Sequence, residues 1–398
     1  MSLRVLIDGR KLCDGGIGVY IENLVNGLIS LKYSPNITLL TTSAAACCES
    51  LKNGWGDKIR IEIDDTPKYS FNETFLISQR KKDLIAEHDL FHSPHYTLPL
   101  GIKIPTVTTV HDIIHVTHPD TKIHKPVSKL AISSAIKRST KLITVSYSSL
   151  HAIKNQFGDS SVDKFAVVHN AIRNQIQRLS ESEVSEALSR NRIDSPYYLY
   201  VGPDRPHKGF KEILKAFSKI DGNIKLLCIT NQLTEWSKNF IESNQLSERV
   251  VLLDHVENHD LSAFYQGTLG CIVASKEEGF GLVALEAMVC GAPLISTPVS
   301  SIFEVCGDYP LYLDGFDSES ILRGINQISS HDWHRKVTDS RSRLAAYSIE
   351  KHGIETLRVY EQAVSLEKNK TFDPGFKSPL YVPNKRSINK SFGLASAF

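Results

Sequence analysis

The 398-residue chain is longer than one hydrophobic core usually organises, so its length predicts two domains. Apolar residues make up 41% of the chain and charged residues 23%, values that exclude a largely disordered protein. The 46 Lys and Arg residues are nearly balanced by 44 Asp and Glu residues, and the net charge of +2 argues against nucleic acid as a partner.

The N-terminal apolar run, residues 3–8, is too short for the core of a secretion signal. Charges, prolines or glycines interrupt every candidate for the roughly 20 apolar residues of a membrane span. The seven cysteines are an odd number and contain no Cys-x-x-Cys pair. We therefore expect reduced thiols and a cytoplasmic protein, with a peripheral position at the inner face of the plasma membrane as a further option.

In the first half, short apolar runs alternate with segments of helical period, including 20–31 and 127–137, which predicts a parallel sheet covered by helices. The expected strands there are 3–8, 37–40, 61–63, 106–110, 142–145 and 165–168. The second half repeats the pattern. Its expected strands are 197–201, 224–230, 250–253, 270–274, 294–296 and 311–313.

Between the halves, residues 174–195 are polar and end in Ser195-Pro196, which predicts a linker. The predicted division is an N-terminal domain 1–173, the linker 174–195, a C-terminal domain 196–347, a helix 348–366 that packs back towards the N-terminal domain, and a tail 367–398. Two doubly wound α/β domains of this kind would face each other across a cleft, with ligands at the carboxyl ends of their strands.

A glycine-rich turn follows the first expected strand. At Gly15 and Gly16, backbone N–H groups can approach an anion, assisted by the dipole of the helix that follows. Ile21 stands where a dinucleotide-binding G-x-G-x-x-G motif needs its third glycine, which weakens a dehydrogenase interpretation. A turn that only connects strand and helix remains the alternative.

His111 comes directly after the expected strand 106–110, where side chains open into the cleft. A functional histidine is one interpretation and a structural one the other. The spacing Asp112-x-x-His115 provides only two metal ligands, and the chain has no Asp-x-Asp to hold a nucleotide through a cation. The sequence therefore predicts no metal site.

A second loop leads from strand 197–201 into a helix. Arg205 and Lys208 bracket a proline there, which suits a clamp for a diphosphate leaving group. Two solvated loop cations are the alternative.

The most specific motif runs from Glu278 to Glu286. We expect its helix N-terminus to hold phosphate, Glu286 to accept hydrogen bonds from ribose hydroxyls, and Glu278 to lie beside a sugar. A helix that merely exposes a glutamate is the alternative. The turn between the two glutamates comprises Gly279, Phe280, Gly281 and Leu282, and we expect these four residues to bind the ligand that donates the sugar.

With the Cys290-Gly291-Ala292-Pro293 that follows, this motif resembles the E-x7-E region of the retaining GT-B glycosyltransferases of the family-4 type. The resemblance extends from about residue 5 to about residue 364 and includes the segments 144–148 and 167–172. It implies a GT-B architecture, in which two doubly wound, Rossmann-like domains face each other across a cleft. It also implies an enzyme that needs neither a metal ion nor another cofactor.

The resemblance also implies roles for individual residues. Gly15 and Gly16 correspond to the donor-phosphate loop, and His111 corresponds to a histidine near the hydroxyls of the donor sugar. Arg205 and Lys208 correspond to the basic pair on the diphosphate.

In the E-x7-E region, Glu278 would contact the transferred sugar and Glu286 the nucleoside ribose. Two departures from the family pattern stand out. Pro203 occupies the place of an arginine that often follows the glycine of the basic loop, and Ala171 replaces the usual glycine after Asn170.

The implied function is retaining hexosyl transfer from a nucleotide-diphosphate sugar to a glycan, lipid-linked or small hydroxyl acceptor in bacterial surface-polysaccharide assembly. Mannose from GDP-mannose, or a UDP-sugar, is the favoured donor. A sugar-nucleotide epimerase, a phosphorylase of the same shape and a non-catalytic sugar-binding protein remain alternatives. Basic residues at 80–82 and 122–141, beside Val127 and Leu130, indicate either contact with an anionic membrane or a solvated face.

Overall fold

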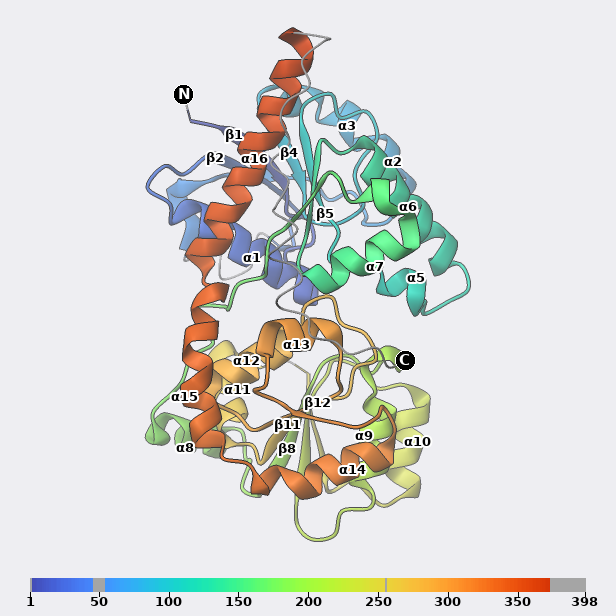
Figure 1. The fold of residues 1–398 in the computed structure, drawn as a ribbon, viewed down its shortest axis with the longest axis vertical. Coiled ribbons are helices and arrows are strands. Elements are labelled where there is room, and N and C mark those ends of the chain that lie inside the picture. The colour runs from blue at the N-terminus through green and yellow to red at the C-terminus, as the bar shows by residue number, and fades with distance from the viewer. Residues whose placement is uncertain (1, 46–53, 255, 373–398) are drawn as a thin grey trace.

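The computed structural model describes residues 2–45, 54–254 and 256–372. Figure 1 shows two α/β domains, one above the other, each with a central sheet and helices on both sides. Helix α16 (Ile349–Phe372) runs beside the N-terminal domain although it belongs to the end of the chain. It includes 367–372 of the predicted tail, and 373–398 lie outside the described residues.

The N-terminal sheet has seven parallel strands in the order β3-β2-β1-β4-β5-β6-β7. The strand order reverses between β1 and β4, which is the switch point of a doubly wound sheet. Its strands are β1 (Arg4–Asp8), β2 (Asn36–Thr41), β3 (Arg60–Ile63), β4 (Leu90–Ser93), β5 (Thr106–Thr109), β6 (Lys141–Thr144) and β7 (Phe165–Val167). Strand β4 is absent from the strands expected from the sequence.

The helices of this domain separate the strands, as right-handed crossover connections of parallel sheets require. They are α1 (Gly15–Ile29), α2 (Phe71–Phe75), α3 (Ile77–Arg80), α4 (Lys82–Ala86), α5 (Ile114–Thr117), α6 (His124–Arg138) and α7 (Tyr147–Phe157). The central strand β1 buries Val5, Leu6 and Ile7 completely, because helices cover both faces of the sheet.

The C-terminal sheet has six parallel strands in the order β10-β9-β8-β11-β12-β13. Its strands are β8 (Tyr197–Val201), β9 (Lys225–Ile229), β10 (Val250–Leu253), β11 (Gly270–Val273), β12 (Leu294–Ser296) and β13 (Leu311–Tyr312). Its helices are α9 (Phe210–Phe217), α10 (Glu235–Ser243), α11 (Asn258–Gly267), α12 (Leu282–Cys290), α13 (Ser300–Cys306), α14 (Ser318–Gln327) and α15 (Trp333–Leu344). Both sheets confirm the predicted GT-B architecture.

The segment predicted as a linker contains a helix, α8 (Glu181–Arg190). Ser180 and Glu183 form a capping box at its start, in which each side chain accepts from the other residue's backbone N–H. Ala187 of α8 packs against Ala263 of α11. The helix therefore belongs to the packing of the C-terminal domain.

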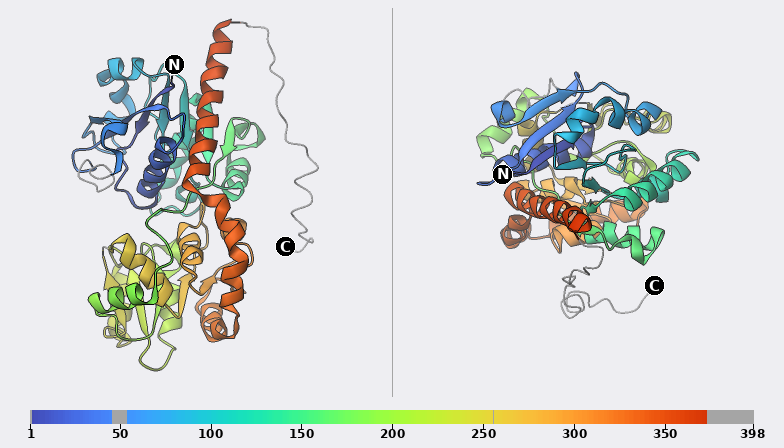
Figure 2. Two further views of the ribbon diagram at one scale, coloured as in Figure 1. Left: turned by 90° about the vertical axis from the view of Figure 1, so that its left-hand side faces the viewer. Right: turned by 90° about the horizontal axis from the view of Figure 1, so that it is seen from above.

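Two chain segments pass between the domains, and they are hydrogen-bonded to each other where Ile172 N–H donates to Tyr347 O at 2.9 Å. Beyond Tyr347, α16 crosses α1 at a contact between Gly27 and Gly353, where a Cβ on Gly353 would lie 2.4 Å from a backbone carbon of Gly27. Figure 2 shows α16 lying along the N-terminal domain. Backbones this close tolerate only glycine.

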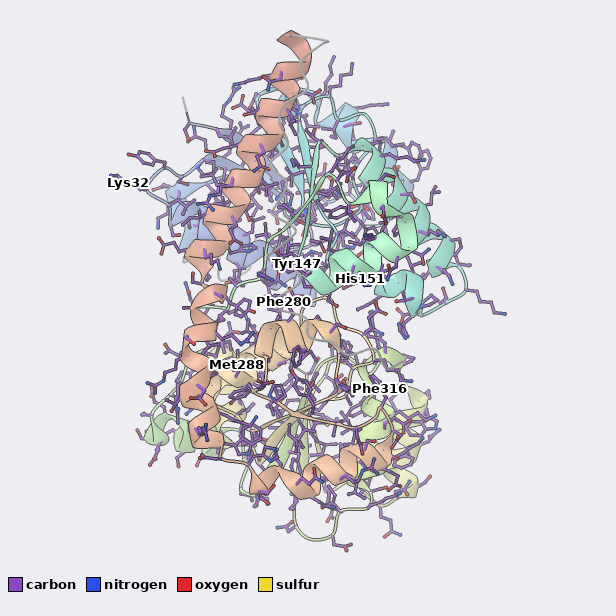
Figure 3. The ribbon with its side chains drawn as sticks, in the orientation of Figure 1. Lys32, Tyr147, His151, Phe280, Met288 and Phe316 are labelled. Atoms are coloured by element: carbon purple, nitrogen blue, oxygen red, sulfur yellow. The ribbon has the colours of Figure 1, made fainter. Side chains whose placement is uncertain are left out.

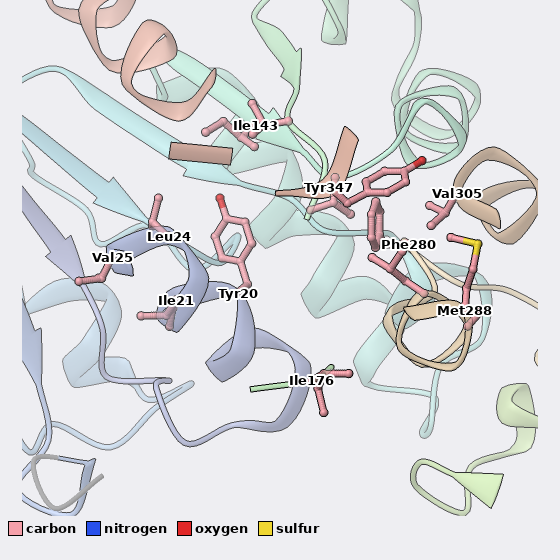
Figure 4. Packing of buried hydrophobic residues seen from close by; sticks show 14 of the residues in the cluster. Tyr20, Ile21, Leu24, Val25, Ile143, Ile176, Phe280, Met288, Val305 and Tyr347 are labelled. Atoms are coloured by element: carbon pink, nitrogen blue, oxygen red, sulfur yellow. The ribbon is translucent and has the colours of Figure 1, made fainter. Parts of the chain in front are cut away.

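Aromatic side chains pack where the two domains meet. Phe280 is 3% exposed, and its ring lies edge-on to Tyr347 at a centroid distance of 5.7 Å. Val305 and Met288 lie beside this pair (Figure 4). The ring of His169 lies 6.0 Å from that of Tyr147 and 6.1 Å from that of Phe280, centroid to centroid, and Figure 3 labels Tyr147 and Phe280 in the region where the domains meet.

The structure describes the state of five cysteines and the apolar character of the helices. The thiols of Cys228, Cys271, Cys290 and Cys306 are free and buried. The expectation of reduced thiols is wrong at Cys13, which is disulfide-bonded. Among the described residues, no helix combines the length and apolar character that crossing a bilayer requires.

Candidate active site

The loops that follow β5, β8 and β11 meet between the two domains. A Cβ on Gly279, after β11, would lie 2.9 Å from Asp112 Oδ2 and 3.1 Å from His111 O, both of which follow β5. Arg205 Nη1, after β8, lies 3.6 Å from Asp120 Oδ2 of the N-terminal domain. The loops that carry His111, Arg205 and Glu278 are therefore brought together where the two domains meet, at the carboxyl ends of the strands.

Glu278 and Lys208 form the centre of this region on the C-terminal side. Lys208 Nζ donates to Glu278 Oε1 at 2.6 Å, and Ser275 Oγ donates to the same oxygen at 2.6 Å. Burial disfavours the charged carboxylate, but the charge and hydrogen bond of Lys208 outweigh it and hold the pKa of Glu278 below its ordinary value. Glu278 is therefore an anion at neutral pH.

Arg205 is more exposed than Lys208, with 46% of its side-chain surface accessible against 22%. The turn Pro206–Lys208 is a 3₁₀ helix, and Gly209 follows it with φ of 71° in the left-handed region. A Cβ at Gly209 would lie 2.2 Å from Ala274 O, so this turn packs tightly against the end of β11. The packing fixes where Lys208 meets Glu278.

His207 lies between the two cations. Its burial, with the charge of Lys208 beside it, lowers the pKa of His207 to about 4. The imidazole is therefore neutral near pH 7, and Arg205 and Lys208 are the cations of this loop.

Glu286 lies on α12 and is 4% exposed. Arg173 donates to Glu286 Oε1 from Nε at 2.9 Å and from Nη2 at 2.6 Å, and Tyr265 Oη donates to Oε2 at 3.0 Å. Arg173 Nη1 donates in turn to Asn258 Oδ1 at 2.8 Å. An ionised carboxylate has about four acceptor sites, so Glu286 can accept a further hydroxyl.

Arg173, which the sequence analysis did not single out, contacts the candidate site residue Glu286. Burial opposes its charge, but Glu286 outweighs this and raises the pKa of Arg173 above its ordinary value. Arg173 lies just after the family-like segment 167–172, which is the only local signal for it. Its partner is 113 positions away, so no sequence spacing reveals the pair.

His111 is held in place from both sides. Its Nε2 N–H donates to Pro94 O at 2.8 Å, and its ring lies edge-on to Tyr20 at a centroid distance of 4.7 Å. Burial lowers the pKa of His111 below its ordinary value. The neutral imidazole therefore presents its Nδ1 as the remaining polar atom.

Gly15 and Gly16 form the start of α1, and both are exposed. Gly15 has a φ of 48°, which favours glycine. Apart from the chain neighbours and the backbone of α1 itself, no described atom lies within 4 Å of a Cβ built on either residue. The turn is open, and the structure brings neither glycine into contact with the other predicted residues.

The turn of the E-x7-E region is built into the domain contact. Ser146 Oγ and Ser149 Oγ, at the start of α7, donate to Gly279 O at 2.6 and 3.0 Å. Gly281 has a φ of 95° and precedes α12, whose first residue Leu282 is half-buried. Phe280 packs in the core of the contact between the domains.

Carboxylates that the sequence analysis did not single out also cross this contact. Glu304 of α13 accepts hydrogen bonds from Tyr147 N at 2.9 Å, Ser148 N at 3.0 Å and His169 Nε2 at 2.8 Å. Glu277 Oε2 accepts from His118 Nδ1 at 2.9 Å. Such contacts join elements more than 130 positions apart and leave no local pattern in the sequence.

Asp112 and His115 have protein partners. Asp112 Oδ1 accepts from Ile114 N at 2.9 Å, and His115 Nδ1 is hydrogen-bonded to Tyr96 Oη at 3.1 Å. Within the described ranges, no three His, Cys, Asp or Glu side chains gather in an arrangement that could hold a metal ion.

The fold and the cleft define a two-domain enzyme of the GT-B class, and comparisons with known proteins agree. The family model described as Glycosyltransferase Family 4 matches residues 14–175, and the one described as Glycosyl transferases group 1 matches residues 184–351. The chain belongs to the GT-B glycosyltransferases of the family-4 type.

Curated relatives include two bacterial mannosyltransferases. The chain is 25% identical to the O-antigen chain mannosyltransferase RfbU of Salmonella typhimurium over 59% of this chain and 63% of that protein. It is 26% identical to the O-antigen chain mannosyltransferase B of Escherichia coli over 68% of this chain and 74% of that protein. The chain thus spans most of the length of mannosyltransferase B but less than two thirds of the length of RfbU.

Solved structures share the fold at low identity. Sucrose-phosphate synthase from Thermosynechococcus elongatus superposes with a TM-score of 0.73 at 17% identity, over 92% of this chain and 100% of that chain. The Anabaena protein HepE in complex with UDP-glucose superposes with a TM-score of 0.71 at 16% identity, over 91% of this chain and 100% of that chain.

Proposed function

We propose that this glycosyltransferase moves a hexosyl residue from a nucleotide-diphosphate sugar to a hydroxyl acceptor with retention at the anomeric carbon. The observation that carries the proposal is the Lys208–Glu278 ion pair at 2.6 Å, with Arg205 on the same loop and His111 across the cleft. The arrangement supplies two cations for a diphosphate and one fixed anion beside the sugar. Neither cation is buried, so a diphosphate can reach both.

In the proposed reaction, the bond between the anomeric carbon and the diphosphate oxygen breaks, and negative charge grows on the leaving group. Arg205 and Lys208 stabilise that charge. The anionic Glu278 lies beside the sugar as it acquires oxocarbenium character. The acceptor oxygen attacks from the face that the diphosphate leaves, and a diphosphate oxygen takes the acceptor's proton.

The donor-binding part of the proposal assigns the nucleoside to the C-terminal domain. Glu286 retains acceptor capacity for a ribose hydroxyl beside Arg173, and α12, which carries Glu286, begins four residues after Glu278. His111 Nδ1 is available to a hydroxyl of the donor sugar. Gly15 and Gly16 leave an open turn where a phosphate can approach the start of α1.

For the sugar itself, the O-antigen mannosyltransferases among the relatives favour mannose from GDP-mannose, and the UDP-glucose complex of the structural neighbour makes UDP-sugars the second choice. The acceptor would be a glycan or a lipid-linked saccharide in surface-polysaccharide assembly. The test is incubation with a panel of GDP- and UDP-sugars. Release of nucleoside diphosphate supports the transferase. Release of sugar phosphate indicates a phosphorylase, and no turnover with any donor refutes the proposal.

We also propose that the N-terminal domain docks on an anionic membrane through α6. Ile123, Val127 and Leu130 are 70%, 59% and 73% exposed, and their spacing places them on one helix face. Lysines 122, 125 and 129 accompany them in the sequence. Aliphatic side chains exposed beside cations are suited to the interface of anionic lipids.

Flotation with liposomes tests the docking. Wild-type protein should float with phosphatidylglycerol vesicles at low salt and not with neutral phosphatidylcholine vesicles. Leu130→Ser should reduce flotation, whereas Leu252→Ser, at an exposed leucine of the other domain, should not. Equal flotation with both vesicles, or with neither, refutes docking by charge.

A further inference from the structure

Lys11, in the loop after β1, has a buried ammonium group. Its side chain is 6% exposed, and no described residue accepts a hydrogen bond from Nζ. The nearest carboxylate oxygen, Glu73 Oε1, is 3.7 Å away. Buried donors are almost always hydrogen-bonded, so an unused buried ammonium requires an explanation.

Lys11 lines a small cavity, and its ammonium group lies over an aromatic ring. The cavity has a volume of about 10 Å³ and is lined by Asp8, Lys11, Ile21, Ser93, Pro94, His95 and Thr97. Lys11 Nζ also lies 4.0 Å from the ring centroid of Tyr69. The Tyr69 side chain is 60% exposed, so it borders both the buried ammonium and the solvent. A cavity of this size admits about one oxygen atom.

Tyr69 has a strained backbone. Its φ of 59° lies in the left-handed region, which is uncommon for a bulky residue. The structure maintains it because Tyr69 N–H donates to Glu73 Oε2, and Ser70 caps α2 through the N–H of Glu73. Strain held by such contacts is typical of functional sites.

The charges around Lys11 already cancel. Arg10 donates to Asp8 Oδ1 and Oδ2 at 2.8 and 2.7 Å and to Glu73 Oε1 at 3.0 Å, and all three side chains are under 10% exposed. Arg10 and Lys11 thus balance Asp8 and Glu73. The next carboxylates, Asp14 and Asp64, have Lys68 and Arg80 as ion-pair partners. A phosphate or carboxylate would add an uncompensated charge to a neutral cluster and would not fit the cavity, whereas a neutral hydroxyl would satisfy Nζ at no such cost.

The cavity adjoins the proposed reaction centre. Pro94, which lines it, accepts the hydrogen bond from His111 Nε2 at 2.8 Å. The Tyr69 ring lies edge-on to His95, which also lines the cavity, at a centroid distance of 5.6 Å. The Tyr69 ring, the cavity and His111 are therefore linked through residues 94 and 95.

We propose that Lys11 and Tyr69 form the acceptor subsite for a neutral sugar, in which Lys11 Nζ donates to one sugar hydroxyl and the Tyr69 ring contacts the sugar face. This proposal rests on the proposed function. Amphipathic aromatic rings beside polar groups are suited to sugars, which have apolar C–H faces and polar edges. The acceptor's terminal residue is then an uncharged hexose.

The test uses the full-length protein, a nucleotide sugar that it accepts, and a panel of acceptors. The neutral members are octyl α-mannoside, octyl β-glucoside and octyl β-galactoside, and the anionic members are octyl β-glucuronide and mannose 6-phosphate. Wild-type protein should use at least one neutral member at least tenfold more efficiently than the anionic members. Lys11→Met and Tyr69→Asn should each raise the acceptor KM at least tenfold. Asparagine tolerates the left-handed backbone, so the second variant removes the ring without added strain.

Two readouts separate recognition from folding. Affinity for the nucleoside diphosphate should stay within twofold of wild type in Lys11→Met. The melting temperature is expected to fall, because the variant removes one of the two cations that balance Asp8 and Glu73, so the acceptor KM is measured well below the melting temperature of the variant. Lys32→Met is the control, since Lys32 also lies over a tyrosine ring, that of Tyr33 at 5.5 Å, on an exposed surface. It should leave the acceptor KM unchanged.

Several results would overturn the acceptor subsite. They are an unchanged acceptor KM in Lys11→Met, a preference for the anionic members, and no transfer to any member while the donor is hydrolysed. A melting temperature that falls in Lys11→Met with an unchanged KM would show that Lys11 only supports the fold. Failure to bind or turn over any nucleotide sugar would instead refute the proposed function, so the two failures are distinguishable.

Discussion

The pair formed by Arg173 and Glu286 predicts a stability loss that is larger than any surface ion pair would give. The two side chains are 16% and 5% exposed. In Glu286→Gln, the amide oxygen can still accept from Arg173 and the NH2 group can donate to Tyr265 Oη, but the negative charge that offsets the buried guanidinium is lost. Removing one partner of a buried pair costs about 3–5 kcal/mol. Because Arg173 keeps Asn258 and some solvent, we expect a value near the lower end of that range.

For a domain of this size, about 3 kcal/mol corresponds to a melting temperature lower by about 6–12 °C, measurable by circular dichroism. Arg173→Met/Glu286→Met should recover most of the loss, because it removes both polar partners. Asp314→Asn is the control. It breaks an ion pair with Arg323 in which both side chains are more than half exposed, and it should change the melting temperature little.

The same variant tests the ribose contact. A charge-assisted hydrogen bond contributes about 1.5–3 kcal/mol, so Glu286→Gln should bind nucleoside diphosphate roughly 10- to 100-fold more weakly in calorimetry below its melting temperature. Unchanged affinity in the folded variant would refute the ribose role. An unchanged melting temperature would refute the reasoning from the buried pair.

Three further outcomes are expected. Arg205→Ala and Lys208→Ala should each lower kcat by about 10²–10³-fold and change donor affinity less, because the negative charge on the leaving group is greatest in the transition state. Wild-type turnover in both variants would show that the diphosphate binds elsewhere. Gly353→Ala should destabilise the N-terminal domain by about 1–3 kcal/mol in urea unfolding, because the new Cβ would meet the backbone of α1. An unchanged unfolding midpoint would contradict that contact. The pKa of Glu278 is lowered from 4.5 in the folded state, so its contribution to stability is full above pH 4.5 and is lost as the pH falls through the lower folded value. Unfolding between pH 3 and 6 should therefore depend less on pH in Glu278→Gln, and an identical profile would contradict the paired carboxylate.

The strands of the C-terminal domain could be predicted from sequence because each is an apolar run between turn residues. Strand β4 could not, because Leu90-Phe91-His92-Ser93 is short and half polar. His92 is fully buried there only because Tyr360 and Thr109 form hydrogen bonds with its two ring nitrogens at 2.6 and 2.9 Å. Tyr360 lies 268 positions away, and local pattern carries no trace of such a partner.

Within the candidate site, the local motifs were informative and the contacts between them were not. The sequence places Glu278 and Lys208 on separate loops, and their ion pair depends on how the ends of β8 and β11 adjoin in the sheet. Lys11 could not be selected from the sequence, because a lysine in a loop is usually a solvated cation. Only the structure shows that its side chain is buried. Helix α8, in contrast, could have been predicted from local sequence, because Ser180 and Glu183 have the spacing of a capping box at a helix start.

The crossing of α16 over α1 has a consequence for biosynthesis. Val359, Tyr360 and Ala363, from the last described helix, are buried in the same core cluster as residues of α1 and β1. Chains emerge from the ribosome at about 5–20 residues per second, and domains usually fold in the order in which they emerge. Here the domain that is synthesised first cannot complete its core until the end of the chain arrives. Premature termination before α16 would therefore leave the N-terminal domain incomplete even though residues 1–173 are all present.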